Sequence, residues 1–123
     1  MNKAQAIARM VRLGVVSEVA ASSIHFSNIN SAKDVWWLDI PLAKLDSAGS
    51  QKIGLLLYDD KSDQLYYLEV PKSYLKDHLS RLVVRATKGC ISLELSTDSH
   101  KLFRDVRPAG GGVNFGQFLK YPD

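Results

Sequence analysis

The sequence contains few of the features that mark secreted or membrane-spanning proteins. Cys90 is the only cysteine, so no disulfide can form within the chain, which is typical of a cytoplasmic protein. No apolar run approaches the roughly 20 residues that a transmembrane helix requires. Arg9, Arg12 and Glu18 interrupt the apolar N-terminal segment, so we expect no signal peptide. These absences predict a soluble cytoplasmic protein that makes no membrane contact.

Motifs for metal binding and for nucleophilic catalysis are also missing. His25, His78 and His100 lie far apart, and no second cysteine is present, so no zinc-binding spacing occurs. Without a base partner in the sequence, Cys90 is most simply a packed thiol. The sequence therefore predicts no metal site and no cofactor. It singles out no catalytic residue, which favours a protein without enzymatic activity.

The residues that are present suit one globular domain over residues 1–123. The chain is 46% apolar and 24% charged, close to the average for folded domains. Its net charge of +3 is uneven along the chain: residues 1–33 carry +3, residues 34–71 carry −4 and residues 72–107 carry +4. Such blocks are consistent with a dipolar surface whose basic part meets an anionic partner. A solvated surface with clustering by chance is the preferred interpretation, because blocks of sequence need not form patches in space.

Hydrophobic periodicity predicts an N-terminal helix over residues 2–13. Its apolar stripe consists of Ala4, Ile7, Ala8 and Val11, and Gly14 ends the pattern. Residues 15–32 are ambiguous, because they fit either a short helix over 17–21 or a strand that reaches Phe26. Later helices are expected over 73–79 and from residue 97 or 98 to 107, before the Pro108–Gly112 break.

Strand patterns predict the rest of the fold. The expected strands cover residues 35–42, 52–58, 64–70, 81–86, 90–96 and 113–119. Alternation pairs Tyr58 with Gln64 in one hairpin and Thr87 with Cys90 in a second. We therefore expect an α+β fold: a mainly antiparallel sheet of five or six strands with two or three packed helices.

The second hairpin carries a charge prediction. In its expected register Arg81 and Arg85 share a face with Glu94, which lies between them and balances their charge. Part of the positive charge of residues 72–107 is therefore neutralised within the hairpin. This weakens the argument that the basic composition alone indicates nucleic-acid binding.

Carboxylates on apolar strand faces supply one enzymatic alternative. Asp39 and Glu69 each share a face with apolar side chains, which is costly unless the charge is paired, binds a metal or lies at the rim of the sheet. Asp60, Glu69 and Lys72 are loosely similar to the magnesium site of metal-dependent nucleases. The spacing Glu-Val-Pro-Lys is one residue too long for that pattern, so rim and turn carboxylates are the preferred interpretation.

Adjacent aromatic pairs carry the leading functional prediction. Trp36 and Trp37 point to opposite faces of one strand, and Tyr66 and Tyr67 do the same. Tryptophan and tyrosine are favoured at interfaces because they combine a large apolar area with a polar group. We predict a non-enzymatic binding module that contacts a protein partner, or a second copy of itself, through these four residues. Packing in a core is the alternative interpretation.

Nucleic-acid binding through a basic patch is the second functional prediction. The candidate anion-binding residues are Arg81, Arg85, Lys88, Arg104 and Arg107. Whether they converge on one surface depends on the fold.

Overall fold

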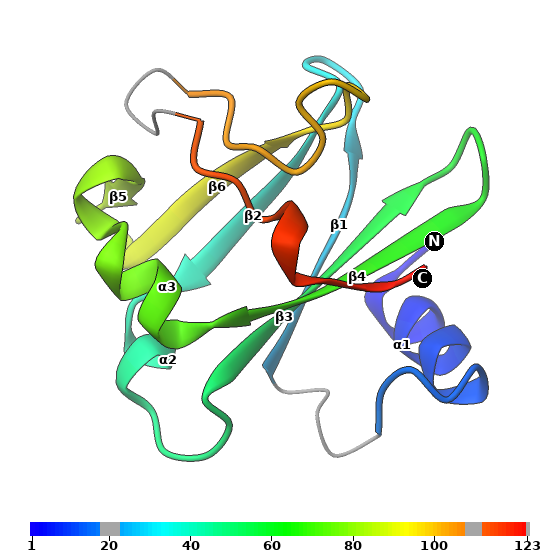
Figure 1. Cartoon of the computed structure of the whole chain (residues 1–123), viewed down its shortest axis with the longest axis horizontal. Coiled ribbons are helices and arrows are strands. Elements are labelled where there is room, and N and C mark those ends of the chain that lie inside the picture. Colours follow the sequence, from blue (N-terminus) through cyan, green and yellow to red (C-terminus); the bar gives the residue numbers. More distant parts are fainter. Residues whose placement is uncertain (18–22, 108–111, 123) are drawn as a thin grey trace.

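The computed structural model describes residues 1–17, 23–107 and 112–122, and its central feature is one seven-stranded sheet (Figure 1). The strand order is β5-β6-β2-β1-β3-β4-β7. The strands are β1 (Ile24–Asn30), β2 (Val35–Pro41), β3 (Lys52–Asp59), β4 (Gln64–Pro71), β5 (Val83–Arg85), β6 (Cys90–Ser96) and β7 (Leu119–Tyr121). The α+β class is confirmed, but the sheet has seven strands rather than five or six. It is also mixed, because β1 runs parallel to β3.

The parallel pair arises from a crossover between β2 and β3. Strands β1 and β2 form an antiparallel hairpin, and the chain then passes through the short helix α2 (Ala43–Asp46) before β3 pairs with the other edge of β1. The sequence did not predict this parallel pair, because residues 15–32, which include β1, fitted either a helix or a strand. The strand interpretation holds for Ile24–Asn30, while the alternative helix over 17–21 lies almost wholly outside the described residues.

The N-terminal helix is confirmed as α1 (Lys3–Arg12). Asn2 caps it, because its side chain accepts the Gln5 N–H while the Gln5 side chain accepts the Asn2 N–H. Gly14 follows in the left-handed conformation with φ +73°. The expected apolar stripe is correct only in part: Ile7 packs against the smaller core, but Ala4 and Ala8 are exposed and the fully buried positions are Ala6 and Met10.

The β3–β4 hairpin forms in a register one residue away from the expected one. Tyr58 pairs with Leu65 rather than Gln64, so Leu56 lies opposite Tyr67 and Leu57 opposite Tyr66. A shift of one residue exchanges the two faces of a strand. Both strands are apolar on both faces, so side-chain alternation did not determine the register.

The β5–β6 hairpin is shifted by two residues, because Arg85 rather than Thr87 pairs with Cys90. An even shift keeps each side chain on its expected face. Strand β5 is also shorter than expected, and the 3-10 helix η2 (Leu79–Arg81) precedes it. Helix α3 (Lys72–Asp77) corresponds to the predicted helix over 73–79, but Pro71 rather than Ser73 occupies its N-cap position.

The helix expected after residue 97 does not form. Phe103 has φ +64°, which is incompatible with a right-handed helix, and Asp105 forms an antiparallel bridge with Leu95 at the edge of β6. The predicted final strand is replaced by the 3-10 helix η4 (Gly116–Phe118) and the short strand β7. Part of the predicted Pro108–Gly112 break lies outside the described residues.

Two clusters of buried side chains pack the helices against the sheet. The larger one includes Trp36, Leu55, Leu93 and Phe103, and residues of α3 and α2 contribute to it. The smaller one joins Ala6 and Met10 of α1 to β1, β3 and β4. Figure 1 shows α1 well separated from α2 and α3. No helix in the described ranges is long and apolar enough to span a membrane.

The sheet opens between β1 and β2. These strands pair only next to their turn, through Ile29↔Trp36 and Asn30↔Val35. Beyond that point β2 continues its pairing with β6, while β1 pairs with β3. The first residues of β1, before Ile29, therefore have no pairing with β2. Side chains of this part of β1 line both hollows described below.

Candidate functional site

The four predicted partner-binding aromatics have very different environments. Trp36 is 1% exposed and stacks on Phe103, with ring centroids 5.6 Å apart. Tyr66 is half-buried against both rings, while Tyr67 is buried on the opposite face beside α1. Trp37 is 42% exposed. The structure does not bring the four together, and Trp37 is the one whose ring is open to a partner.

Polar and cationic groups surround Trp37. Its Nε1 donates to the Ser92 hydroxyl oxygen at 3.0 Å, and the Arg85 guanidinium lies 5.2 Å from the ring centroid. Arg107 also donates to the Ser92 hydroxyl oxygen, at 2.9 Å. These contacts fix the orientation of the indole and leave much of the ring exposed beside two arginines.

A shallow groove of about 350 Å³ lies next to Trp37, where β1 and β2 diverge. We call it the Trp37 groove, and its lining residues are Ser27, Asn28, Asn30, Trp37, Asp39 and Lys88. Most of these side chains carry hydrogen-bonding groups. Asp39, expected on an apolar face, is exposed here and borders the groove.

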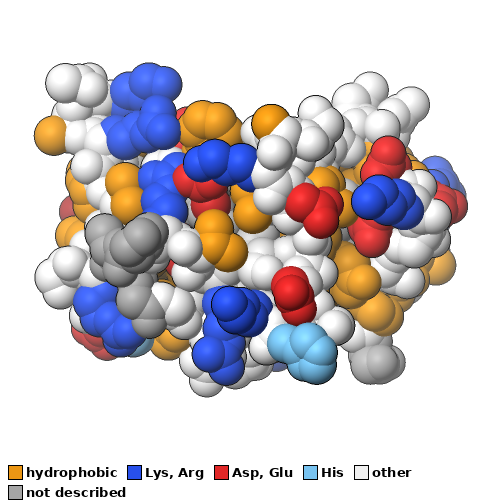
Figure 2. Space-filling view, turned by 90° about the horizontal axis from the view of Figure 1, so that it is seen from above, with side chains coloured by type: hydrophobic (Ala, Val, Ile, Leu, Met, Phe, Trp, Pro, Cys, Tyr) orange, Lys and Arg blue, Asp and Glu red, His pale blue; other side chains and the backbone are white. Residues whose placement is uncertain are grey.

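Three of the five predicted anion-binding residues lie at this surface. Arg85 and Arg107 contact Trp37 or its partner Ser92, and Lys88 lines the groove. Arg81 ends η2 and Arg104 bridges Asn114, and neither is a lining residue. Figure 2 shows the basic side chains of one face in separate groups with acidic side chains between several of them.

Glu94 of β6 lies opposite Trp37 of β2 and is only 5% exposed. Lys33 Nζ lies 3.1 Å from one carboxylate oxygen, and Arg107 Nε donates to the other. Burial raises the pKa of Glu94, but the hydrogen bonds from Lys33 and Arg107 outweigh it and hold that pKa below its usual range. Glu94 is neutralised as expected, although by these two cations rather than by Arg81 and Arg85.

The residues of the nuclease alternative do not assemble. Glu69 and Lys72 line one cavity, whereas Asp60 lies in the β3–β4 turn at the opposite end of the hairpin. Among the described residues, no group of three or more histidine, cysteine or acidic side chains is placed to hold a metal ion. This arrangement does not provide the paired carboxylates that such chemistry needs.

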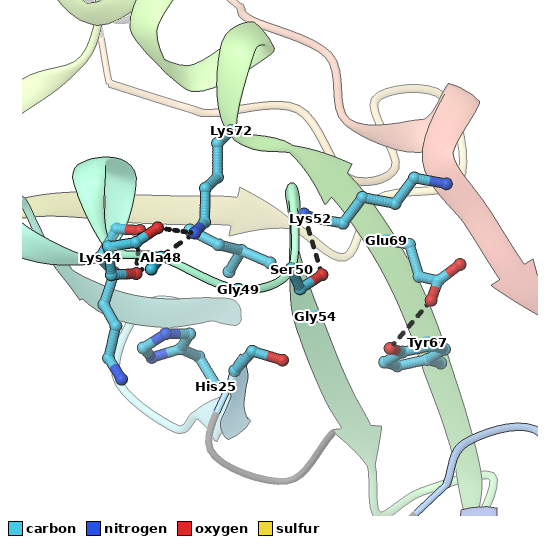
Figure 3. A pocket seen from close by; sticks show the side chains of 13 residues that line it. His25, Lys44, Ala48, Gly49, Ser50, Lys52, Gly54, Tyr67, Glu69 and Lys72 are labelled. Carbon is cyan, nitrogen blue, oxygen red and sulfur yellow. Dashed lines mark hydrogen bonds between the residues drawn. The ribbon is translucent and has the colours of Figure 1, made fainter. Parts of the chain in front are cut away.

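The cavity that holds Glu69 and Lys72 is larger, at about 520 Å³, and we call it the lysine cavity (Figure 3). Its lining residues are Ser23, His25, Lys44, Ser47, Ala48, Gly49, Ser50, Lys52, Ile53, Gly54, Tyr67, Glu69 and Lys72. They come from β1, from α2 and the loop after it, from β3 and β4, and from the start of α3. Residues this far apart in sequence give no motif, so the sequence did not predict the cavity.

Burial shifts the pKa values of His25 and Tyr67 in the lysine cavity. It lowers the pKa of His25 to about 4, and the positive charges of Lys3 and Lys44 act in the same direction. Burial, together with the charge and hydrogen bond of Glu69, raises the pKa of Tyr67 to about 12. His25 is therefore neutral near pH 7, and the Tyr67 hydroxyl keeps its proton, which it donates to Glu69 at 3.4 Å.

Comparison with known protein families, with curated proteins and with solved structures found no match for this chain. The two hollows must therefore be interpreted from their chemistry.

Proposed function

We propose that this protein is a non-enzymatic binding module that holds single-stranded nucleic acid against the Trp37 groove. The observation that carries the proposal is the exposed Trp37 ring, which borders a polar groove and has Arg85 and Lys88 beside it. Proteins that bind single strands combine aromatic rings, on which bases stack, with cations that contact the backbone phosphates.

The lining of the groove suits an unpaired nucleotide. Asn28 Nδ2 already donates to the Met1 carbonyl oxygen and Asn30 Oδ1 already accepts the Ala32 N–H. The Asn28 side-chain carbonyl oxygen and the Asn30 amino group can still accept from and donate to the edge of a base. A base that stacks on Trp37 must leave the stack of its own strand on that face, which a single strand allows more easily than a double helix does. A single strand therefore fits this small hollow better than a double helix.

A protein partner that covers Trp37 would bury the same ring, and the two functions differ in their response to salt. Binding to a single strand releases counterions, so log Kd changes with log[salt] by about 0.7 for each neutralised phosphate. Because Arg107 is paired with Glu94, Arg85 and Lys88 are the two cations available beside Trp37, and we expect a slope of about 1.4. A contact dominated by apolar burial shows little salt dependence.

The direct test is fluorescence anisotropy with a labelled oligothymidine of about 15 nucleotides, a length that spans one binding module of this kind. Trp37→Ala should weaken binding by about 5- to 150-fold, because stacking of one base on an aromatic ring is worth about 1–3 kcal/mol. Arg85→Gln and Lys88→Gln should each weaken binding and reduce the salt slope.

Leu13→Ala is the matched control, since Leu13 is also an exposed large apolar residue but lies just after α1. It should bind the oligonucleotide as the unmodified protein does. Absence of binding at low salt, or equal losses for Trp37→Ala and Leu13→Ala, would contradict the proposal.

A further inference from the structure

Lys72 is an unusual member of the lysine cavity because its side chain is buried. The residue is only 7% exposed, whereas lysine is almost never fully buried unless its charge is compensated. Its Nζ donates to the Ser47 carbonyl oxygen at 3.1 Å and to the Ser47 hydroxyl at 3.2 Å. An ammonium group has three N–H donors, so one of them has no acceptor among the described residues. No carboxylate of those residues forms an ion pair with Lys72.

Glu69 is the one acidic residue among the lining residues. The Tyr67 hydroxyl donates to it at 3.4 Å, and in the parts of the chain that the structure describes no cation forms an ion pair with it. Figure 3 shows Lys72 reaching the loop over 47–50 on one side of the cavity, with Glu69 and Tyr67 on the other. Lys52 lies on the Glu69 side, but it is exposed and forms no ion pair within the described ranges. Lys72 and Glu69 therefore border the same hollow without neutralising each other.

The other titratable groups of the lining do not neutralise these two charges. Burial lowers the pKa of His25 to about 4, so the imidazole carries no charge near pH 7. The pKa of Tyr67 is raised to about 12, so its hydroxyl keeps the proton that it donates to Glu69. Lys44 has an interaction of its own. The lining therefore presents a buried ammonium group on one side and a carboxylate on the other.

One ligand can supply the missing partner of each charge. Buried charges in proteins are normally paired, and hydrogen bonds between charged groups are about twice as strong as those between neutral groups. A carboxylate group matches Lys72, because it carries the opposite charge and accepts the remaining N–H. An ammonium group matches Glu69, whose carboxylate can accept more hydrogen bonds than the one from Tyr67. A purely anionic ligand would match Lys72 but would be repelled by Glu69.

We propose that the lysine cavity binds a small amino carboxylate, a molecule whose carboxylate group pairs with Lys72 and whose ammonium group pairs with Glu69. The volume of about 520 Å³ is within the range of small-molecule sites. Because the two residues lie on opposite sides of the cavity (Figure 3), a chain or a ring separates the two charged groups of the ligand.

This site is separate from the Trp37 groove, because the two hollows share no lining residue. The proposal does not depend on nucleic-acid binding. Failure of either proposal leaves the other standing, since the variants that test them are different.

The test is a titration of the full chain with amino carboxylates of increasing length: glycine, β-alanine, γ-aminobutyrate, δ-aminovalerate and ε-aminocaproate. ¹H–¹⁵N NMR spectra measure the affinity, and we expect saturable shifts of the amides of the lining residues Gly49, Ser50 and Gly54. Each compound is compared with the unsubstituted carboxylate of the same length, which lacks the ammonium group. At one or more lengths the amino compound should bind about three- to tenfold more tightly, because only it pairs with Glu69.

Two variants assign the two charges. Glu69→Gln should remove the preference for the amino compound, so that it and the matched carboxylate bind with equal affinity. Lys72→Met should weaken the binding of both by about tenfold or more, because it removes a charged hydrogen-bond donor. If Lys72→Met does not fold, Glu69→Gln still tests the site, since Glu69 is only partly buried.

Lys52→Met is the matched control, because it makes the same substitution at an exposed lysine of the same cavity. It should not weaken the binding of the preferred amino carboxylate by more than about twofold. A loss of about tenfold would show that Lys52 holds the carboxylate group, and would overturn the proposal. Equal affinities of every amino carboxylate and its matched carboxylate, or no saturable binding at all, would also overturn it.

Discussion

Trp36 and Trp37 show how one residue step decides the role of a side chain. Successive side chains of a strand point to opposite faces, so β2 places Trp36 in the larger core and Trp37 at the surface. Each indole N–H has a partner: that of Trp36 donates to the Tyr58 carbonyl oxygen and that of Trp37 to Ser92. The same residue type thus stabilises the fold at one position and is open to a ligand at the next.

Glu94 provides a test of a buried charge at the scale of a single residue. Glu94→Gln keeps the shape but leaves Arg107, whose side chain is 16% exposed, without its anionic partner. We expect the free energy of unfolding to fall by about 2–4 kcal/mol, because removing one member of a buried pair leaves the other charge uncompensated. Chemical denaturation at pH 7 measures this change.

The control for Glu94 is an exposed pair of the same kind. Asp46 lies 3.0 Å from Lys76 and is largely exposed, and such pairs contribute about 0–1 kcal/mol. Asp46→Asn should therefore cost much less than Glu94→Gln. Similar losses for the two variants would show that burial does not strengthen the Glu94 contacts.

The sequence predicted which face of the β5–β6 hairpin each side chain lies on better than it predicted the ion-pair partners of Glu94. Val83 and Arg85 were placed on the correct face of the β5–β6 hairpin, because a shift of two residues preserves alternation. The cations that neutralise Glu94 were missed. Lys33 is 61 residues away in sequence, and Arg107 ends a segment that was expected to be helical, so nothing local indicates either contact.

At the scale of elements, strand positions were more predictable than strand registers. Polar turns and Pro71 mark the ends of β3 and β4, so both strands were found within about one residue. Their register depends on which apolar face meets which core, and Leu55, Leu56 and Leu57 are all buried. Alternation carries no information in such a run. The parallel pairing of β1 with β3 was missed for a related reason, since it depends on a contact across the α2 crossover.

Gly54 tests the packing between β3 and β4. A Cβ atom at this position would lie 2.9 Å from Tyr67 Cε1 and 3.0 Å from Ile24 Cγ1, closer than van der Waals contact permits. Gly54→Ala should lower the free energy of unfolding by about 1–3 kcal/mol, because the buried Tyr67 ring must move. Thermal or urea denaturation measures the loss.

A double-mutant cycle identifies the neighbour that causes this loss. If the ring is responsible, Gly54→Ala should cost at least about 0.5 kcal/mol less in a Tyr67→Leu background than in the unmodified chain. Additive losses would mean that Tyr67 is not the obstacle. Gly89→Ala is not a suitable control, since Gly89 has φ +61° and a side chain there is strained in open space.

At the scale of the whole molecule, the Trp37 groove lies where the sheet opens between β1 and β2, and the lysine cavity lies at the start of β1. His25 lines the lysine cavity and Ser27 lines the Trp37 groove, and alternation places these two side chains on the same face of β1. A fully paired seven-stranded sheet would cover that edge. Composition and periodicity do not reveal where a sheet opens, so the sequence predicted residues around Trp37 but neither hollow.

The stability of the whole molecule should report the burial of His25 as the pH falls. Its pKa is about 4 in the folded protein, against 6.5 for an ordinary histidine, so below pH 6.5 the unfolded chain binds more protons than the folded one. The contribution of neutral His25 to the free energy of unfolding is fully present above pH 6.5 and is lost as the pH falls toward 4. Because His25 is partly exposed, we expect a loss of about 1–2 kcal/mol rather than the full value of the shift.

Urea denaturation of the unmodified protein and of His25→Gln at a series of pH values isolates this contribution. Glu94, Asp105 and the other acidic groups are common to both proteins, so their titration cancels in the difference. The unmodified protein should lose stability relative to His25→Gln between pH 6.5 and 4, and the difference should be constant above pH 7. A difference that does not change with pH would show that His25 titrates in the folded protein as it does in the unfolded chain, and that the wall of the lysine cavity is open to water.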